Sequence, residues 1–387
     1  MSTYVDIHII QSLPPSCVNR DDSGSPKSAV YGGVRRLRVS SQSWKRATRL
    51  YFNDLLDAKD VGVRTKRVVE VLAERITEDA PELADAAAAL AEKVFDAAKI
   101  KLAPPRGKDK KDAPQESGYL LFLSTSQIAR LAGLAIASAR GGEALDAKAV
   151  KRIFKEAHAV DIALFGRMVA DDTDLNVDAA CQVAHAISTH AAENEYDFFT
   201  AVDDDKSRSE EEDAGAGMMG TVEFSSATMY RYATVNLDML VENLGDDDAA
   251  LRALEVFIKG FCLSMPTGKQ NTFANRTLPE AVVVSVRDDQ PVSLVGAFEK
   301  PIRTNEADGY LTRSVGALAE HARAIEDNYG LKPLAGFVVA LKGGDILAPE
   351  GPDAPAPLGE RVSFTELPGR VLEAVSPSPR VGREERA

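Results

Sequence analysis

The chain has 387 residues, of which 44% are hydrophobic and 27% are charged, and its formal net charge is −13. These values are typical of a soluble globular protein of about two to three domains. Three widely separated cysteines without CxxC spacing support neither a disulfide framework nor a zinc ribbon, and they favour a reducing, cytoplasmic location. The start of the chain lacks a secretory signal, and no apolar run approaches ~18 residues. We therefore expect neither export nor a membrane-spanning segment.

Charge is unevenly distributed along the chain. Residues 1–52 contain eight Lys or Arg residues and three Asp residues, a net charge of +5, so the other 335 residues carry −18. Arg and Lys concentrated in one segment of an acidic protein predict one defined phosphate-binding surface. The acidic remainder disfavours nonspecific binding to nucleic acid.

The first elements are strands around a long loop. Val5, Ile7 and Ile9 alternate with other residues, which predicts a strand. The Pro-, Ser- and Asp-rich segment Pro14–Gly33 is expected to be a functional loop. Residues Val34–Val39 follow as a strand with Leu37 and Val39 on an apolar face and Arg36 and Arg38 on a cationic face.

A basic helix is expected after this strand. Ser40 and Ser41 are good N-cap residues for a helix that extends to about Phe52. Hydroxyl and amide groups at a helix start can contact phosphate, and cations one turn further add charge. The residues with these roles are Ser40, Gln42, Lys45, Arg46 and Arg49. The alternative is a solvated basic helix face, which is the usual meaning of a charge run.

A helical insertion occupies about residues 61–164. The expected helices cover 68–100, 125–140 and 148–164, and the Pro- and Lys-rich loop 104–115 separates the first two. A further helix is expected over 178–192.

The second half of the chain alternates strands and helices. Residues 198–202 and 221–236 are strand-prone and flank an acidic, Gly-rich segment, so a projecting hairpin is predicted. A helix is expected over 248–263, and strands over 281–286 and 335–341. This order is consistent with an α+β fold with a ferredoxin-like sheet, the class that includes RRM modules.

Catalytic and metal motifs are incomplete. Gly268-Lys269 resembles the end of a P-loop, but Gln270 replaces the Ser or Thr that holds magnesium. The Asp172–Asp178 run resembles an EF-hand loop, but it lacks the required glycine and glutamate. Cys181 and His185 lie four apart on the expected helix, where ordinary packing competes with metal binding. We therefore expect no cofactor, no metal site and no catalytic residue.

For several other residues, the sequence is consistent with either a binding role or a packing role. His8 can be a general base on an RNA-facing surface or a histidine that bonds a neighbouring strand. Arg167 and Met168 can contact a phosphate and an unstacked base or pack at a domain junction. Met218 and Met219, at the expected hairpin tip, need a partner to cover them. Lys269 and Gln270 stand in a phosphate-contacting loop or a surface turn.

Several ordered motifs lie between the first strand and about residue 330: Pro15–Asp22, Gly32-Gly33, Arg38–Ser43, Lys45–Ala47, Asp161–Met168, Ala184–His190, Phe199–Asp204, Glu223–Ser226, Tyr230–Ala233 and Lys269-Gln270. Through these motifs the chain resembles the type I-E CRISPR Cascade backbone subunit family, also called CasC. The likeness weakens in the Ala-rich insertion and the Lys-rich loop.

The resemblance implies a hand-shaped protein with an RRM-like palm, a helical finger domain and a thumb hairpin. The implied boundaries are palm 1–58, fingers 59–180, a palm linker helix 181–193, thumb 194–222, palm 223–373 and a disordered tail 374–387.

The resemblance also implies a function. Copies of the subunit line up along a CRISPR RNA, and each thumb displaces one guide nucleotide while the other bases stay free to pair with target DNA. Expected partners are the CRISPR RNA, the target DNA strand and guide–target heteroduplex, other copies of the chain and other Cascade subunits. The implied RNA-binding residues are Arg20, Lys27, Ser40, Gln42, Lys45, Arg46, Arg49, Arg167, Met168, Phe199, Thr200, Met219, Lys269 and Gln270.

Two alternatives stay open. Related backbone subunits of RNA-targeting complexes cut RNA with a loop aspartate, and Asp21 and Asp22 stand in the corresponding region, although the type I-E resemblance argues against cleavage. The second alternative is a monomeric RRM adaptor for single-stranded RNA. Lys300 and Arg303 are weak candidates for contacts to target DNA.

Overall fold

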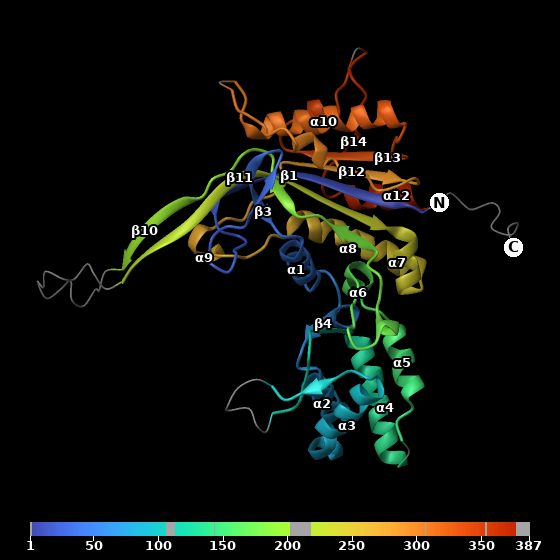
Figure 1. Cartoon of the computed structure of the whole chain (residues 1–387). Helices are drawn as coiled ribbons and strands as arrows, with labels where there is room; N and C mark the ends of the chain where they lie inside the picture. The colour runs from blue at the N-terminus through green and yellow to red at the C-terminus, as the bar shows by residue number, and fades with distance from the viewer. Residues whose placement is uncertain are drawn as a thin grey trace, which may run out of the picture. The chain divides into compact units, whose positions relative to one another are not determined.

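The computed structural model describes residues 2–105, 113–142, 144–201, 218–305, 307–352 and 354–376 (Figure 1). The chain divides into two compact units. The first, the sheet unit, comprises Met1–Thr48, Val183–Thr234 and Phe257–Ala387, and the second, the helical unit, comprises Arg49–Gln182 and Val235–Val256. The helical unit thus begins earlier than the expected finger domain and includes a second segment.

The sheet unit is built on a large, mostly antiparallel sheet with the strand order β14-β13-β12-β1-β11-β9-β3-β2, and β8 and β10 also pair with β11. Only the β13–β14 pair is parallel among the described pairings. The strands are β1 (Tyr4–Ser16), β2 (Ser28–Tyr31), β3 (Val34–Val39), β8 (Cys181–Val183), β9 (Ala186–Ser188), β10 (Glu195–Ala201), β11 (Met218–Asn236), β12 (Ala281–Arg287), β13 (Ala335–Ala340) and β14 (Glu360–Arg361).

Most predicted strands are confirmed, with one boundary corrected. Strand β1 is longer than the alternation of Val5, Ile7 and Ile9 indicated, because the residues between them are buried as well. A strand with two buried faces lacks the alternation of apolar and polar residues on which the prediction rested. The expected loop Pro14–Gly33 therefore shrinks to the segment between β1 and β2.

Helices cover both faces of the sheet. Helix α10 (Tyr310–Tyr329) packs Val315 and Leu318 against Ile10 and Val283, which form one core. Helix α1 (Ser41–Phe52) places Trp44 in the core on the opposite face. The other helical segments of this unit are α9 (Gln270–Phe273), η5 (Val295–Phe298), α11 (Gly344–Leu347), α12 (Leu367–Val375) and the end of α8 (Asp247–Leu263). Helix α12 ends two residues inside the predicted tail, and residues 377–387 lie outside the described part.

The helical unit has its own hydrophobic core. Ser124 and Gln127 form a capping box at the start of α4, with the Gln127 amide 2.9 Å from Ser124 Oγ. The predicted helix over 68–100 is interrupted at Ala80, because Pro81 lacks the amide that would continue it. The elements are η1 (Ala58–Asp60), β4 (Gly62–Thr65), α2 (Val68–Asp79), η2 (Pro81–Ala86), α3 (Ala87–Ala97), β5 (Leu102–Ala103), β6 (Glu116–Ser117), β7 (Leu121–Ser124), α4 (Thr125–Gly141), α5 (Ala147–Lys155), α6 (Val160–Phe165), η3 (Thr173–Leu175) and α7 (Leu237–Leu244).

The helix expected over 178–192 is wrong, and so is the linker helix expected over 181–193. The segment instead forms β8 and β9, and β9 pairs with both β3 and β11 inside the sheet. All three residues of β9 are buried, so the segment has no polar face to indicate a strand. The Cys181 and His185 side chains consequently do not share a helix, which removes the basis of the metal hypothesis.

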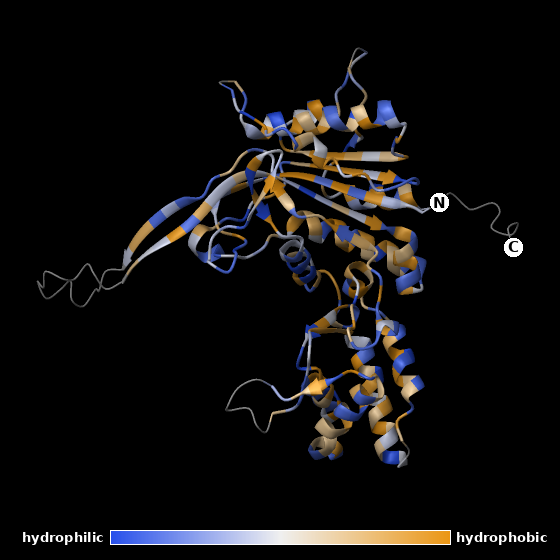
Figure 2. Ribbon diagram, in the orientation of Figure 1, coloured by the Kyte–Doolittle hydropathy of each residue, from blue (hydrophilic) through white to orange (hydrophobic). Residues whose placement is uncertain are grey.

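Strands β10 and β11 form the predicted hairpin arms, from the pair Glu195 and Phe224 to the pair Ala201 and Met218. Figure 2 shows hydrophilic and hydrophobic residues alternating along both strands. The acidic segment between them, residues 202–217, and residues 106–112 of the Lys-rich loop lie outside the described residues.

The fold is α+β, as predicted from the sequence, with a large, mostly antiparallel sheet and packed helices. The finer interpretation, a ferredoxin-like palm with a thumb, stays a prediction. None of the helices in the described ranges combines the length and apolar character that crossing a bilayer requires.

Candidate nucleic-acid interface

The start of α1 is assembled from three segments of the sheet unit. The Ser40 hydroxyl accepts the Ser43 amide at 3.3 Å, and Asn19 Oδ1 accepts the Ser40 amide at 2.8 Å. His185 Nδ1 accepts the Ser41 amide at 2.9 Å. Ser40 is therefore the N-cap, as predicted, but it is only 5% exposed and its hydroxyl is occupied by capping.

The loop before β2 places two cations next to this helix start. The Lys27 amide donates to Asn19 O at 2.9 Å, and the Arg38 amide donates to Lys27 O at 2.9 Å. Arg20 forms an isolated bridge with Pro26 across the loop, and its side chain is exposed. The loop thus lies along the end of β3 and holds Lys27 beside Arg38.

His185 belongs to the same group of residues. Burial lowers the pKa of its imidazole, and the nearby Arg38 and Lys27 lower it further. The ring is thus neutral near pH 7, and because Nδ1 accepts the Ser41 amide, Nε2 carries the proton and can donate to an anion. Sequence reasoning weighed His185 only as a metal ligand; its place in the motif Ala184–His190 was the available signal.

Helix α1 turns a polar face outward. Gln42 and Arg46 are exposed and Lys45 is half-buried, whereas Trp44 and Thr48 are each 1% exposed. The helix thus separates a buried face, with Trp44 and Thr48, from an outward polar face.

Arg49 is oriented differently from Lys45 and Arg46. Its guanidinium lies over the Phe122 ring, 5.1 Å from the centroid. It also opposes the burial that raises the pKa of Asp161 to about 6. Arg49 thus makes contacts inside the helical unit, which sequence spacing alone did not indicate.

A second loop packs against the first. A Cβ on Gly268 would lie 2.3 Å from Val18 O, so glycine is required for this close approach. Lys269 and Arg20 both oppose the burial that raises the pKa of the Cys17 thiol, which places the two cations near the same side chain. Gln270 begins α9 and is exposed.

These contacts define a surface that we call the basic interface. It belongs to the sheet unit, and it brings together most of the predicted phosphate-binding residues with two that the prediction omitted, Arg38 and His185. Its members are Arg20, Lys27, Arg38, Gln42, Lys45, Arg46, His185, Lys269 and Gln270.

Another predicted cation of β3 is not part of this surface. Arg36, expected on a cationic face with Arg38, is fully buried. Its guanidinium donates to Tyr31 O, Ser188 O and Phe298 O at 2.8 to 3.1 Å. The expectation was wrong because β2, β9 and η5 supply carbonyls that surround the Arg36 guanidinium.

Exposed aromatic and methionine side chains share one face of the hairpin. Because cross-strand partners project to the same side, Thr200 and Met219 share a face with Phe198 and Tyr196. Phe198, Tyr196 and Met219 are 64%, 68% and 63% exposed. We call these four residues the exposed hairpin face. The prediction named Thr200 and Met219 but missed the two aromatic residues, which the alternation along β10 could have revealed.

Phe199 lies on the other side of the hairpin. Its ring covers Gly220, where a Cβ would lie 2.6 Å from the ring. Phe199 is therefore separated from Thr200 and Met219, with which it was grouped from the sequence.

The predicted phosphate contact of Arg167 is wrong. Arg167 is 4% exposed, and its guanidinium donates to Leu175 O at 3.0 Å and Phe154 O at 2.7 Å within the helical unit. Burial lowers its pKa to about 10, so it stays charged at neutral pH. Met168, the next residue, is 77% exposed and remains accessible.

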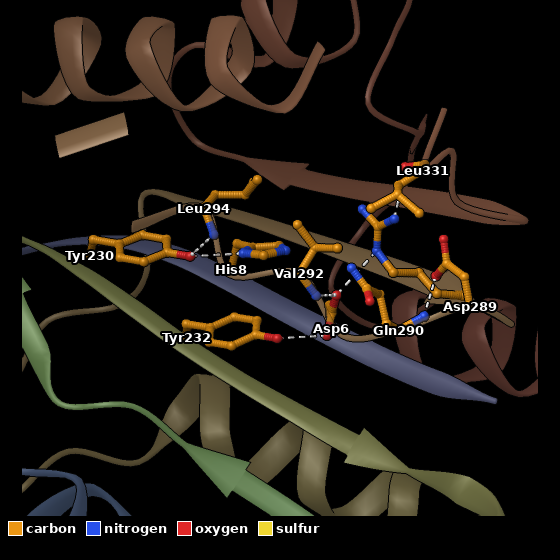
Figure 3. Close-up of polar contacts among 10 residues, drawn as sticks. Asp6, His8, Tyr230, Tyr232, Asp289, Gln290, Val292, Leu294 and Leu331 are labelled. Atoms are coloured by element: carbon orange, nitrogen blue, oxygen red, sulfur yellow. Dashed lines mark hydrogen bonds and ion pairs between the residues drawn. The ribbon is translucent and has the colours of Figure 1, made fainter. Parts of the chain in front are cut away.

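His8 lies in the interior, where Figure 3 shows a buried polar network between β1, β11 and β12. His8 Nδ1 is 3.0 Å from the Tyr230 hydroxyl, and burial lowers the pKa of His8 to about 3. Asp6 accepts from the Tyr232 hydroxyl at 2.9 Å and Arg287 Nε at 3.1 Å. The hypothesis of a surface general base is wrong, and the alternative of a histidine bonded to a neighbouring strand is confirmed.

The aspartates of the ribonuclease alternative lie in the loop before β2. Both are exposed, but the Asp21 carboxylate accepts from Ser23 N at 3.0 Å, Ser23 Oγ at 2.7 Å and Ser25 N at 3.0 Å. These bonds lower the pKa of Asp21 and close the loop on itself. Within the described ranges, no three His, Cys, Asp or Glu side chains are grouped as metal ligands.

Residues 5–354 match the model of a protein family described as CT1975-like protein. A chain of a solved "CRISPR RNA-guided surveillance complex, pre-nicking" is 37% identical, with 96% of this chain and 99% of that chain covered and a TM-score of 0.82. A chain of a "CRISPR RNA-guided surveillance complex" is 32% identical over the same shares, with a TM-score of 0.73. No curated protein matches the sequence.

Proposed function

Because this chain belongs to the CT1975-like protein family, we propose that it is a backbone subunit of a CRISPR RNA-guided surveillance complex and binds the guide RNA through the basic interface. The observation that carries the proposal is that the loop with Arg20 and Lys27 is bonded to the start of α1 and packs against the loop with Lys269, in a chain whose net charge is −13. Such a surface attracts one polyanion, and the rest of the protein repels others.

The chemistry of the basic interface suits a backbone subunit. Lys and Arg neutralise phosphates, and the Gln42 amide and His185 Nε2–H can donate to phosphate or ribose oxygens. None of these contacts requires a particular base. A guide held in this way keeps its base edges available for pairing, so sequence specificity is delegated to the RNA.

We further propose that the exposed hairpin face contacts the guide. Unpaired bases stack on aromatic and apolar side chains without sequence preference. Tyr196, Phe198 and Met219 are exposed on one face and would be covered by a displaced nucleotide. This is the displacement that the type I-E resemblance implies for a thumb.

Charge distribution supports repeated binding along one guide. Residues 193–223 contain eleven acidic and two basic residues, a net charge of −9, whereas residues 1–52 carry +5. The acidic segment of one copy can therefore approach the basic segment of the next. Such a head-to-tail contact produces open, extendable assemblies.

In this proposal the subunit acts in antiviral defence in the cytoplasm as part of a type I-E ribonucleoprotein. The guide pairs with target DNA, other Cascade subunits complete the assembly, and the chain itself is not an enzyme. The second candidate, a metal-dependent ribonuclease, is favoured only by the exposure of Asp21 and Asp22 beside the basic interface.

The test is to purify the chain with a co-expressed guide and examine it by electron microscopy and nuclease protection. We expect regular filaments and protected RNA, whereas a monomer with an unprotected transcript would reject the proposal. Adding complementary RNA and Mg²⁺ separates the two candidates, because only the ribonuclease would produce regularly spaced cuts that Asp21→Asn abolishes.

A further inference from the structure

Arg231 is a buried cation in β11, directly beneath helix α1. It is 1% exposed, and its neighbours Tyr230 and Tyr232 belong to the core on the opposite face of the sheet, which α10 covers. The Arg231 guanidinium carbon lies 3.6 Å from the centroid of the Trp44 ring and 4.6 Å from that of Phe261. Trp44 belongs to α1 and Phe261 to α8, so one side chain joins a strand to two helices.

Neutral acceptors hold the Arg231 guanidinium in place. Nη1 donates to Gln11 Oε1 at 2.5 Å, and Nη2 donates to Phe261 O. Gln11 is fixed in turn, because its Nε2 donates to Thr277 O at 2.9 Å. Arg231 Nε and Trp44 Nε1 have no hydrogen-bond partner among the described residues, so ring and guanidinium meet through their faces.

This contact determines how α1 is rotated about its axis. Successive residues of a helix differ by about 100° in direction, so fixing the Trp44 ring also fixes the directions of Lys45 and Arg46. Thr48 Oγ1 lies 3.4 Å from Ser264 Oγ one turn further along, on the same buried side. A planar guanidinium restrains an indole ring in orientation as well as in depth.

We infer that Arg231 is a positioning residue for guide binding: by stacking on Trp44 it sets the rotation of α1 that turns Lys45 and Arg46 toward the RNA phosphates. This inference rests on the proposed function of the basic interface. Arg231 itself touches no RNA.

The experiment is a double-mutant cycle on the full chain, read as the dissociation constant for a synthetic guide RNA. Lys45→Ala with Arg46→Ala weakens binding by wild type about tenfold or more. In the Arg231→Met background the same pair of changes weakens binding less than threefold further, because the two cations are already misdirected. Equal losses in both backgrounds would overturn the inference.

A loss of stability alone must be separated from a loss of positioning. Arg36→Met is the matched control, because Arg36 is likewise buried and bonded to carbonyls but lies over no residue of α1. We expect it to lower the melting temperature while leaving the effect of the Lys45 and Arg46 changes intact. If Lys45→Ala with Arg46→Ala no longer weakened guide binding in the Arg36→Met background either, this result would count against the inference.

The single tryptophan of the chain provides a direct readout. Because Trp44 is the only indole, its fluorescence reports on this contact, and we expect Arg231→Met to shift the emission of the folded protein.

If Arg231→Met does not fold, Arg231→Lys keeps the charge without the planar stack. In this variant, guide binding should likewise depend less on Lys45 and Arg46 than it does in wild type. If those two changes do not weaken wild-type binding, the proposed role of α1 is wrong and the inference falls with it.

Discussion

His185 Nδ1 accepts the Ser41 amide at 2.9 Å and so joins the segment between β8 and β9 to the first turn of α1. The two residues are 144 positions apart in sequence. The imidazole satisfies an amide that has no intrahelical acceptor, and it stands beside Lys27 and Arg38 in the basic interface.

We predict that His185→Ala lowers the free energy of unfolding by about 1 kcal/mol, as the loss of a capping acceptor does, and weakens guide binding. Chemical denaturation and RNA titration measure the two effects. His321→Ala, at a histidine outside the basic interface, is the control for guide binding. Unchanged binding by His185→Ala would remove His185 from the interface.

Charge reversal on α1 tests the basic interface directly. Lys45→Glu with Arg46→Glu should weaken guide binding at least 100-fold, since two attractive phosphate contacts become repulsive. Alanine at both positions should reduce the slope of log K against log salt by about 1.4. Lys148→Glu with Arg152→Glu changes the charge equally on α5 of the helical unit and should leave guide binding unchanged. Arg49 is not suitable for this test, because it contacts Phe122.

The hairpin gives different roles to two consecutive residues, Phe198 and Phe199. Phe198→Ser should weaken guide binding about tenfold without changing the melting temperature, because Phe198 is 64% exposed and a stacked base is worth about 1–3 kcal/mol. Phe199→Ser should lower the melting temperature instead, because the ring covers Gly220. Melting curves and RNA titrations of both variants measure the two effects. A lower melting temperature for Phe198→Ser together with weaker guide binding for Phe199→Ser would contradict the assignment of faces.

Arg167 is predicted to be structural. Arg167→Met removes the donor of Leu175 O and one of the two donors of Phe154 O, which keeps its bond from Gln127 Nε2, and we expect a loss of about 3 kcal/mol in the free energy of unfolding. Met168→Ala, at the exposed neighbour, should cost less than about 0.5 kcal/mol. Denaturant titration compares the two variants, and similar small losses would show that the Arg167 bonds contribute little.

His8 should make the protein sensitive to acid. Burial lowers its pKa from 6.5 to about 3 in the folded chain, so below pH 6.5 the unfolded chain binds a proton that the folded chain does not. The contribution of His8 to the free energy of unfolding is therefore greatest above pH 6.5. As the pH falls from 6.5 toward 3, the free energy of unfolding decreases by about 1.4 kcal/mol per pH unit. Denaturation of His8→Gln at several pH values should show a correspondingly shallower slope. If the free energy of unfolding falls equally steeply with pH in both proteins, the folded chain takes up the His8 proton as readily as the unfolded chain does.

Local patterns were sufficient for much of the molecule. The capped start of α1 and the two arms of the hairpin follow from hydrophobic spacing and capping residues. The basic interface was predicted as a region because its cations are concentrated in one stretch of sequence.

Burial of individual cations depended on the tertiary structure. Arg36, Arg167 and Arg231 are buried, whereas Arg46 is exposed, although all four are equally charged in sequence. Which guanidinium finds carbonyls or rings around it depends on segments that are remote along the chain, such as Phe298 for Arg36.

By itself, then, the sequence determined the α+β class, the order of most elements and the location of the basic segment, because these depend on neighbours a few residues apart. Only the tertiary structure decided that residues 181–183 and 186–188 are strands, that His185 caps α1, and that Phe199 and Thr200 face opposite ways on the hairpin. The physical reason is that strand pairing and the partners of buried polar groups are contacts between distant segments, which no local pattern records.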